Sequence, residues 1–588
     1  MNIENLRGEF PYLCQPIFEM AFAMWEFITV FVLALMLAYP LGHYLADVMQ
    51  AKPMKSDFIF KWVEHPIYRS LGIKHNGMNW RQYLAAFTAS NMVLLVVSVV
   101  ILMTQAWLPL NPDHVPNMKW DLALHTTISF LTNTDQQHYS GQAQLSYLSQ
   151  MTVIVGMQFL SPIIGLALLT AMLRALFLQA GKAQSKDKQY WNDINLGNYW
   201  MDLIRPLFRF FLPLAFIFSI LLTWQGVPST LSGGPVAHNL DQTVEVKTQH
   251  IPLGPVAPMI AIKQLGSNGG GWYGPNSSVP LENPTPVSNV MQMLAILLIP
   301  LSVVFMIGRF VQRRKLMWMI FGTMLLMSIA STLLSIWTEK FSLLPNIALM
   351  EGKEVRFGVD ASALWGSLTT QVNNGSVNMM HDSASPLNGL VQLCNMLINA
   401  IWGGIGCGVL QFFIYLFLAV FIAGLMTGRT PELFGRKIEV TEIKLLAFVI
   451  LLQPVVILGL TAIAIAVPSL TANSNPAFHG ISQVFYEYVS AFANNGSGFE
   501  GLGDNTVWWN LSASVALLAG RYSVLVVPVL IAVSLATKPK ASESKGSLHV
   551  ESPTFALTLI GIVLILTVLQ FMPVLVLGPI ADYLSIHI

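Results

Sequence analysis

Residues 481–497 read ISQVFYEYVSAFANNGS. A helix that crosses a membrane needs about 20 mostly apolar residues, and the apolar part of this stretch, which ends at Ala493, is about half that length. It runs into a polar cluster of Asn494, Asn495, Gly496 and Ser497, and longer apolar segments stand on both sides. The stretch therefore predicts a half-helix that enters a membrane and stops in a polar turn without crossing.

Three earlier loops repeat this pattern. Short apolar segments lie at residues 120–131, 257–265 and 361–372. The polar clusters that follow them are residues 132–135, 266–271 and 373–376. The asparagines predicted to align are Asn133, Asn268, Asn374 and Asn495. Glycine follows each of them except in the first loop, where Thr134 follows.

Four such turns around one axis are a candidate ion filter. Non-helical backbone at membrane depth is tolerated only where protein or a water-filled cavity surrounds it. Glycine permits positive φ, so successive carbonyl groups can face one axis. Rings of carbonyl oxygens replace the water shell of K⁺, and helix C-termini add negative potential. Any single loop could be an ordinary turn, but four matching loops favour a potassium filter. Its predicted residues are Thr132, Asn133, Thr134, Ser267, Asn268, Gly269, Asn374, Gly375, Ser376, Asn495, Gly496 and Ser497.

The composition agrees with a chain embedded in lipid. Of its 588 residues, 54% are hydrophobic and only 10% are charged, whereas a soluble domain carries about 25% charged residues. A net charge of +1 excludes bulk attraction to nucleic acid, so membrane lipid is the expected surrounding. The three scattered cysteines indicate neither a disulfide framework nor a metal cluster.

Ten apolar segments could cross the membrane. They lie near residues 20–42, 84–108, 150–176, 204–224, 287–309, 316–337, 387–427, 443–468, 508–535 and 554–580. The second to ninth flank the four half-helices in pairs. We therefore predict an all-α integral membrane protein with ten transmembrane helices and four tandem channel-like helix–pore-loop–helix repeats in a pseudo-fourfold arrangement.

This pattern divides the chain into six parts. Residues 1–82 hold an N-terminal extension, an extra span and a basic cytoplasmic loop, and residues 553–588 hold an extra C-terminal span. The pore-loop repeats are predicted at residues 83–176, 203–311, 315–427 and 442–535.

Basic residues gather in alternate loops between the spans. Because cytoplasmic loops carry an excess of lysine and arginine, these loops are predicted to lie inside and both termini outside. Among these residues are Lys52, Lys61, Lys182, Lys186, Arg313, Arg314, Arg429, Lys538 and Lys545.

The seventh apolar segment is too long for one crossing. Gly403, Gly404 and Gly406 stand in its middle and would loosen a helix there. They could let a loop fold beneath the filter as a gate, or they could be small residues for close helix packing.

Motifs along most of the chain resemble one family in detail. The family is the potassium-binding A subunit of bacterial potassium-transporting P-type ATPases, the KdpA family. The motifs include residues 78–83 (MNWRQY), 109–112 (PLNP), 254–257 (GPVA), 268–271 (NGGG), 282–285 (ENPT), 350–354 (MEGKE), 381–383 (HDS), 428–432 (GRTPE) and 494–497 (NNGS).

The resemblance implies a fold like four joined channel subunits in the bacterial cytoplasmic membrane. It also implies a separate ATP-hydrolysing B subunit, a C subunit and a small F subunit as partners. The chain itself has neither a Walker pattern nor the Asp-Lys-Thr-Gly signature of P-type ATPases, so catalysis belongs to a partner. We expect no cofactor here and only K⁺, as the transported ion.

Three residues near the expected path remain open. The family's first turn usually continues Asn-Trp-Gln, whereas this chain has Asp135, Gln136 and Gln137. Asp135 and Gln137 are therefore candidates for the filter entrance, and the alternative for Asp135 is a hydrogen-bonded carboxylate behind the filter. The resemblance makes Arg521 a candidate for lining the cavity below the filter, where its charge would favour release of K⁺. An arginine held by carbonyl groups inside the bundle is the alternative.

Two other functions compete with the pump subunit. A stand-alone potassium channel or ion-coupled uptake protein of the same superfamily would carry the same four loops. A membrane-embedded enzyme is more distant, because His138, His381 and Asp382 are the outer-side groups that suggest chemistry and they form no evident catalytic set.

Overall fold

The structure is a computed structural model that describes residues 3–178, 188–240, 247–341, 348–428, 430–472, 474–540 and 549–587, with side chains described from Trp25 onward in the first helix. Four of the basic residues used to predict the orientation, Lys182, Lys186, Arg429 and Lys545, lie outside the described residues.

Within these residues, ten helical segments are long and apolar enough to cross a membrane, which confirms the predicted fold class. Their main helices are α1 (Ile3–Met49), α3 (Trp80–Thr104), α7 (Val155–Leu173), α9 (Leu212–Trp224), α11 (Pro286–Phe310), α12 (Arg314–Phe341), α15 (Cys407–Met426), α16 (Val440–Ala466), α19 (Val507–Ala536) and α20 (Pro553–Leu575).

The first span ends later than the sequence predicts, and the seventh is broken at the glycines that the sequence predicts would loosen it. The crossing part of α1 reaches Met49, beyond the predicted end at residue 42, because the helix continues through Gly42 and ends only before the turn at Gln50. The seventh segment is broken into α14 (Pro386–Ile398) and α15, and the residues between them form a loop.

Four short helices precede the four polar turns. They are α4 (Trp120–Leu131), α10 (Val256–Leu265), α13 (Gly358–Val372) and α18 (Ala477–Ala493). Nearly all of their residues are buried, because each helix is surrounded by longer helices. Non-crossing backbone of this kind is stable at membrane depth only inside such a protein shell.

The four short helices connect the repeats into a closed ring. Each packs against helices of its own repeat and also against the second span of the preceding repeat: α10 against α7, α13 against α11, α18 against α14, and α4 against α19. Since the last contact joins the first repeat to the fourth, the arrangement is pseudo-fourfold around one axis.

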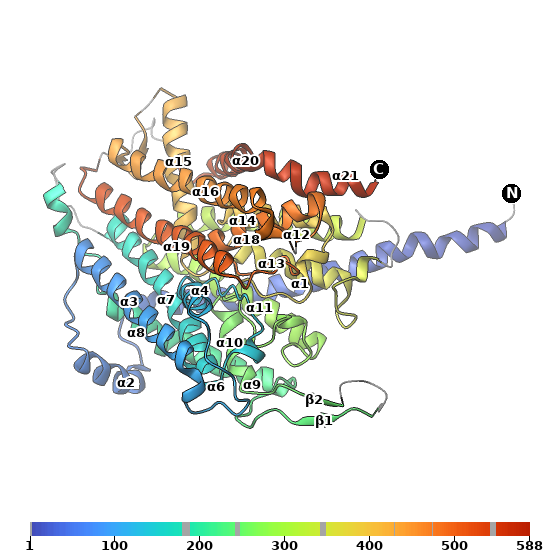
Figure 1. Cartoon of the computed structure of the whole chain (residues 1–588). Coiled ribbons are helices and arrows are strands. Elements are labelled where there is room, and N and C mark those ends of the chain that lie inside the picture. Colours follow the sequence, from blue (N-terminus) through green and yellow to red (C-terminus); the bar gives the residue numbers. More distant parts are fainter. Residues whose placement is uncertain are drawn as a thin grey trace.

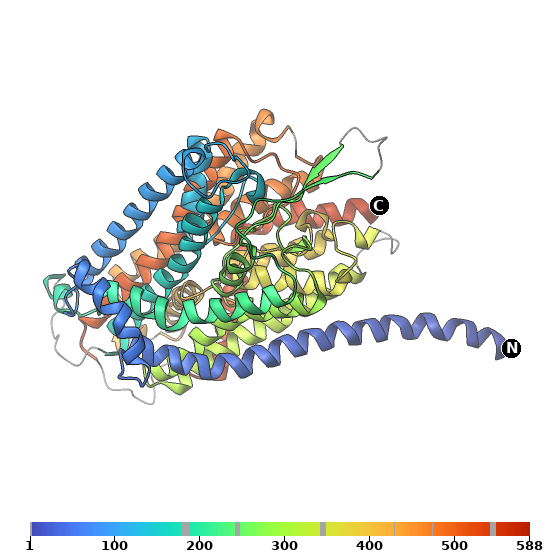
Figure 2. The same ribbon diagram turned by 90° about the horizontal axis from the view of Figure 1, so that it is seen from below.

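The two extra spans cover this ring from outside. Helix α1 packs along α11, and α20 packs against α12 and α15. Figures 1 and 2 show the start of α1 and the end of α21 at the same end of the bundle, as an even number of crossings requires, with α2 at the opposite end.

The remaining elements are short. The further helices are α2 (Asp57–Ser70), α5 (Gly141–Gln144), α6 (Tyr147–Ser149), α8 (Tyr199–Pro206), α17 (Pro468–Thr471) and α21 (Ala581–His587). Strands β1 (Val236–His238) and β2 (Thr248–His250) pair antiparallel with Val236 opposite His250, and β3 (Glu432–Leu433) and β4 (Arg436–Lys437) form a second antiparallel pair.

Candidate functional site

The four short helices end in one common turn. In each turn a backbone N–H reaches five residues back into the helix: Thr134 to Ser129 O at 3.0 Å, and Asn268 to Lys263 O, Asn374 to Thr369 O and Asn495 to Ser490 O at 2.9 Å each. The preceding residue has a left-handed backbone in every case, with φ between 54° and 60°; these residues are Asn133, Ser267, Asn373 and Asn494.

This geometry corrects the alignment drawn from the sequence. Thr134, and not Asn133, is equivalent to Asn268, Asn374 and Asn495. The sequence comparison was shifted by one residue in the first loop because it matched asparagine to asparagine, whereas the turn requires only a left-handed residue at that point. Consequently Asp135 occupies the place of the three glycines that follow the other asparagines, and its φ is 57°.

The backbones of the four turns converge on one point. A Cβ atom added to Gly269 would lie 2.7 Å from the carbonyl oxygen of Thr134 and 3.0 Å from those of Asn374 and Asn495. A Cβ on Gly375 would overlap Asn495 O, and one on Gly496 would overlap Thr134 O. Three carbonyl oxygens, from the first, third and fourth repeats, thus surround Gly269 of the second repeat.

Asparagine side chains link neighbouring turns. Asn495 Nδ2 donates to Thr369 O of α13 at 3.0 Å, and Asn374 Nδ2 donates to Lys263 O of α10 at 3.3 Å. Asn133 Nδ2 donates to Ser267 O at 2.7 Å. These side chains therefore brace the ring of turns.

Two of the predicted serines and both predicted threonines brace the same turns from behind, whereas the buried Ser267 Oγ has no hydrogen-bond partner among the described residues. Ser376 N and Ser497 N each donate to the side-chain oxygen of the asparagine two residues earlier, at 3.0 Å. Thr132 Oγ1 and Thr134 Oγ1 lie 2.9 Å apart, and Asn494 Nδ2 donates to Thr134 Oγ1 at 3.0 Å.

Several supporting residues were missed in the sequence. Asn276 Nδ2 donates to Gly269 O at 2.9 Å, and Trp365 Nε1 donates to Ser376 O at 2.8 Å. Lys263 is fully buried and pairs with Glu282 at 2.7 Å behind the second turn. The lysine inside this apolar half-helix was the one feature of the sequence that could have indicated a buried ion pair, because a buried charge needs a partner.

Asp135 and Gln137 are held by protein groups beside the first turn. Asp135 is 1% exposed, and its Oδ2 accepts a hydrogen bond from Gln158 Nε2 of α7 at 3.0 Å. Gln137 Oε1 accepts from Gly271 N at 2.9 Å. This position favours the alternative in which Asp135 is a carboxylate behind the filter.

Arg521 lies within α19 and is buried. Its Nη2 donates to Ser161 O of α7 at 3.0 Å, so a carbonyl group does hold it. The same nitrogen would be 3.4 Å from a Cβ on Gly165, a point also bordered by Ile405 O and Cys407 Sγ. The guanidinium charge therefore lies beside the loop that interrupts the seventh span.

That loop lies directly beneath the turns. Trp402 N and Gly403 N both donate to Gln371 O in the last turn of α13, at 3.1 and 2.9 Å. Asn399 Nδ2 donates to Ala493 O at the end of α18, at 3.3 Å. The loop is thus attached to the C-terminal ends of two pore helices.

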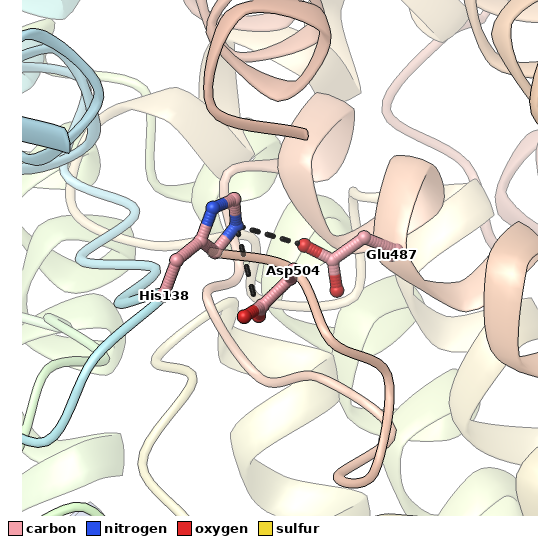
Figure 3. Close-up of side chains that lie close together, drawn as sticks. All are labelled: His138, Glu487 and Asp504. Carbon is pink, nitrogen blue, oxygen red and sulfur yellow. Dashed lines mark hydrogen bonds and ion pairs between the residues drawn. The ribbon is translucent and has the colours of Figure 1, made fainter. Parts of the chain in front are cut away.

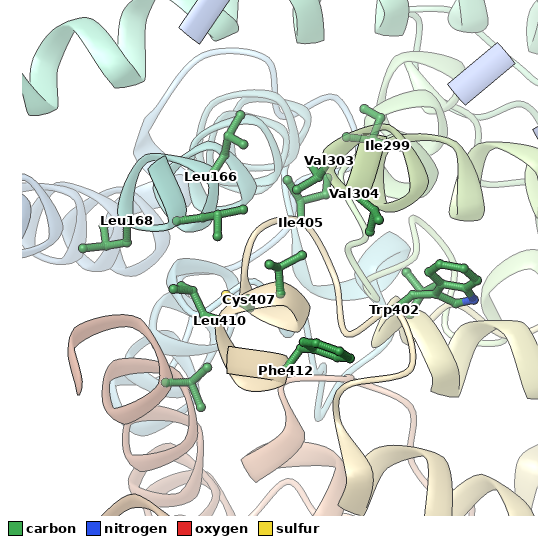
Figure 4. Packing of buried hydrophobic residues seen from close by; sticks show 14 of the residues in the cluster. Leu166, Leu168, Ile299, Val303, Val304, Trp402, Ile405, Cys407, Leu410 and Phe412 are labelled. Atoms are coloured by element: carbon green, nitrogen blue, oxygen red, sulfur yellow. The ribbon is translucent and has the colours of Figure 1, made fainter. Parts of the chain in front are cut away.

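Its glycines adopt conformations that other residues rarely adopt. Gly403, Gly404 and Gly406 have φ of 58°, 78° and 80°, and Gly406 approaches the backbone of Gly165 so closely that a Cβ would overlap it. Figure 4 shows Ile405 of the loop beside Val303 and Val304 of α11, and Trp402 of the loop, Leu166 of α7 and Phe412 of α15 belong to the same buried cluster. The segment is therefore a closely packed apolar loop.

Comparison with known proteins identifies one family. A family model described as the potassium-transporting ATPase A subunit, KdpA, matches residues 28–584. Similar proteins named potassium-transporting ATPase potassium-binding subunit occur in several bacteria. The one from Gloeobacter violaceus is 42% identical over 560 residues, which are 92% of this chain and 95% of that protein. The one from Geobacillus kaustophilus is 43% identical over 578 residues, 96% of this chain and 100% of that protein.

A solved structure of the potassium transporter TrkH from Vibrio parahaemolyticus is also similar. It shares 13% sequence identity with this chain, covers 87% of it and 98% of its own length, and has a TM-score of 0.48.

Proposed function

This chain belongs to the KdpA family, the A subunits of potassium-transporting ATPases, and on that premise we propose that its four turns select K⁺ from the outer side for an ATP-driven uptake pump. The observation that carries the proposal is the convergence of Thr134 O, Asn374 O and Asn495 O on Gly269. Backbone oxygens in such a ring replace the water around K⁺, and four helix C-termini add negative potential at the same place.

The loop at residues 399–406 is the proposed gate below this filter. The loop is hydrogen-bonded to the C-terminal ends of α13 and α18. A shift of the loop would therefore move the ends of these helices, which carry the third and fourth turns. Arg521 lies beside it, and a fixed positive charge there lowers K⁺ occupancy and favours release.

The energy for transport comes from a partner in this proposal. A tenfold gradient costs about 1.4 kcal/mol and one charge gains about 2.3 kcal/mol per 100 mV. A membrane potential of about 150 mV thus supports only a few-hundred-fold accumulation, and scavenging trace K⁺ requires more. We propose subunits B, C and F as the partners, with ATP hydrolysed on B.

The proposed location is the bacterial cytoplasmic membrane, with both termini outside. The ten apolar helices make the chain a multi-pass membrane protein. The basic loops next to α2 and after α11 support the orientation, because lysine and arginine are enriched on the cytoplasmic side.

The test is uptake by reconstituted vesicles. The complex purified from its native membrane should take up K⁺ only when ATP is present, and excess Na⁺ should compete poorly. The chain alone, in the same vesicles, is the control. ATP-independent K⁺ uptake by the chain alone, with no ATPase purified beside it, would favour a stand-alone channel or ion-coupled uptake protein instead.

A further inference from the structure

Three side chains outside the filter gather between the first and fourth pore loops. His138 follows the first turn, Glu487 lies on α18, and Asp504 lies in the loop before α19. His138 Nε2 is 3.1 Å from Glu487 Oε1 and 3.9 Å from Asp504 Oδ2 (Figure 3). One ligand atom from each lies within 4.8 Å of the other two, and the described residues contain no second group of three that does so.

The hydrogen bonds around His138 determine which of its ring nitrogens carries a proton. Asn510 Nδ2 donates to the acceptor-only carboxylate of Asp121 at 2.9 Å, so Asn510 Oδ1 is the atom that faces His138 Nδ1, at 2.7 Å. An amide oxygen accepts, and Nδ1 must therefore carry the hydrogen. Nε2 then faces two carboxylates, so the space between them holds either a second ring proton, which Nε2–H donates to Glu487, or a cation that the ring nitrogen and the carboxylates ligate.

The same hydrogen bond is typical of metal-binding histidines. A histidine that ligates through one nitrogen donates the other N–H to a protein oxygen, which fixes the tautomer and the ring orientation. His125 stacks on the His138 ring with centroids 3.8 Å apart and 18° between the planes. The imidazole is thus held in place before any ion arrives.

The distances suit a small dication. Ligand atoms about 2.0–2.1 Å from a tetrahedral zinc ion lie about 3.3 Å from one another, and the two separations from His138 Nε2 bracket this value. One imidazole nitrogen with two carboxylates is a donor set that favours zinc-class ions, whereas K⁺ prefers oxygen alone.

The site also has access to the outer solution. The side chains of His138 and Glu487 are 0% and 3% exposed, but that of Asp504 is 28% exposed. Gln136 Nε2 donates to Glu487 Oε1, which orients this carboxylate from the first pore loop.

We infer that His138, Glu487 and Asp504 form a binding site for a divalent cation of the zinc class, which joins the first and fourth pore loops at the outer face of the filter. The ion neutralises the two carboxylates and holds together the two loops whose contact closes the ring of repeats.

The test measures metal directly on the purified complex, with affinity tags removed and bound metal stripped by a chelator. After dialysis against micromolar Zn²⁺, elemental analysis should find one zinc per wild-type chain that Glu487→Gln and Asp504→Asn lack. Competition with a chelator should show binding weakened more than a hundredfold in these two variants and about 10–100-fold in Asn510→Ala, which keeps all three ligands but removes the hydrogen bond that orients His138. X-ray absorption of the bound zinc should show imidazole nitrogen and oxygen neighbours at about 2.0–2.1 Å.

Asp113→Asn is the matched control, because Asp113 lies 3.3 Å from His250 in another outer loop, and this pair has no third ligand among the described residues. It should bind zinc like the wild type. Asp504→Asn is the most exposed of the ligand changes, so it tests the site even if a change at buried Glu487 prevents folding. Equal zinc content in the wild type and in Asp504→Asn would overturn the inference. A wild-type complex that binds no zinc would also overturn it, because a proton between His138 and Glu487 would then occupy the site.

Discussion

Asp135 stands in the first turn where Gly269, Gly375 and Gly496 stand in the other three. Its backbone adopts the same left-handed kind of conformation as Gly375 and Gly496, and its side chain points to Gln158 away from solvent. The first repeat therefore places a carboxyl group behind the carbonyl ring, where the other repeats have only hydrogen. The first turn thus differs from the other three by a buried carboxyl group.

Gly375 gives the sharpest test of the filter at the residue scale. Its φ is 84°, and a Cβ there would overlap Asn495 O, so Gly375→Ser must displace a carbonyl group of the ring. We expect K⁺ over Na⁺ discrimination to fall at least tenfold, or about 1.4 kcal/mol, in uptake by the reconstituted complex. Gly322→Ser is the control, because a Cβ on Gly322 of α12 meets nothing within 4 Å. Unchanged discrimination in a folded Gly375→Ser complex would place the ion elsewhere.

At the scale of elements, the loop between α14 and α15 should control the rate of transport rather than ion preference. Gly406→Ala would force the loop away from Gly165, and Gly404→Ala would strain a backbone at φ 78° whose Cβ lies 3.3 Å from Val372 O. We expect the K⁺ uptake rate to change several-fold in both, with the K⁺/Na⁺ ratio unchanged.

The control for this loop is Gly428→Ala at the end of α15. Gly428 also has a positive φ of 66°, but a Cβ there meets nothing within 4 Å. The Gly428→Ala variant therefore adds backbone strain without a steric contact, and it should transport K⁺ at the wild-type rate. A wild-type rate in both loop variants would show that the segment is only a packing element.

The ring of His479, in the first turn of α18, joins this helix to α21 and to the turn at residues 381–383. Its Nδ1 lies 2.8 Å from Asp582 of α21 and its Nε2 lies 3.0 Å from Asp382. Hydrogen bonds to Asp382 and Asp582 raise the pKa of His479 to about 9, above about 6.5 in the unfolded chain. The folded state therefore holds the proton more tightly, and the stability gained is complete below pH 6.5 and lost as pH rises through 9.

Thermal unfolding in detergent between pH 6 and pH 10 measures this contribution. The unfolding temperature of the wild type should fall over the upper part of that range, and His479→Asn should remove most of the fall. His250→Asn, which changes an exposed histidine of β2, should retain the wild-type slope. A slope that is the same in His479→Asn and wild type would contradict the assignment.

For the whole molecule, the orientation of the bundle can be tested with two exposed positions. Leu240 follows β1 and is fully exposed, and Lys540 is exposed beyond α19. In a variant without other cysteines, a maleimide that cannot cross membranes should label Leu240→Cys in intact cells. It should label Lys540→Cys only in inverted vesicles. The reverse labelling pattern would show that the orientation in the membrane is opposite to the one proposed.

The fold was largely readable from local patterns. Half-length apolar segments before polar turns predicted α4 and α18, because segment length alone distinguishes a half-helix from a crossing. The break at Gly403–Gly406 was also signalled by composition, since glycine weakens a helix wherever it stands. The end of the first span was placed too early, at residue 42 instead of Met49, because Gly42 does not end the helix in the folded chain.

The sequence by itself determined the ten spans, the four turns and the family, because hydrophobic length and glycine chemistry act over a few neighbouring residues. Only the tertiary structure decided the register of the first turn, the position of Asp135 and the meeting of His138 with Glu487 and Asp504. The register follows from the hydrogen bond of Thr134 N to Ser129 O, which the residue identities do not show. The meeting of His138 with Glu487 and Asp504 depends on contacts between residues about 370 positions apart, such as His138 and Asn510. No local pattern encodes such contacts, because they arise only when the fourth repeat closes the ring against the first.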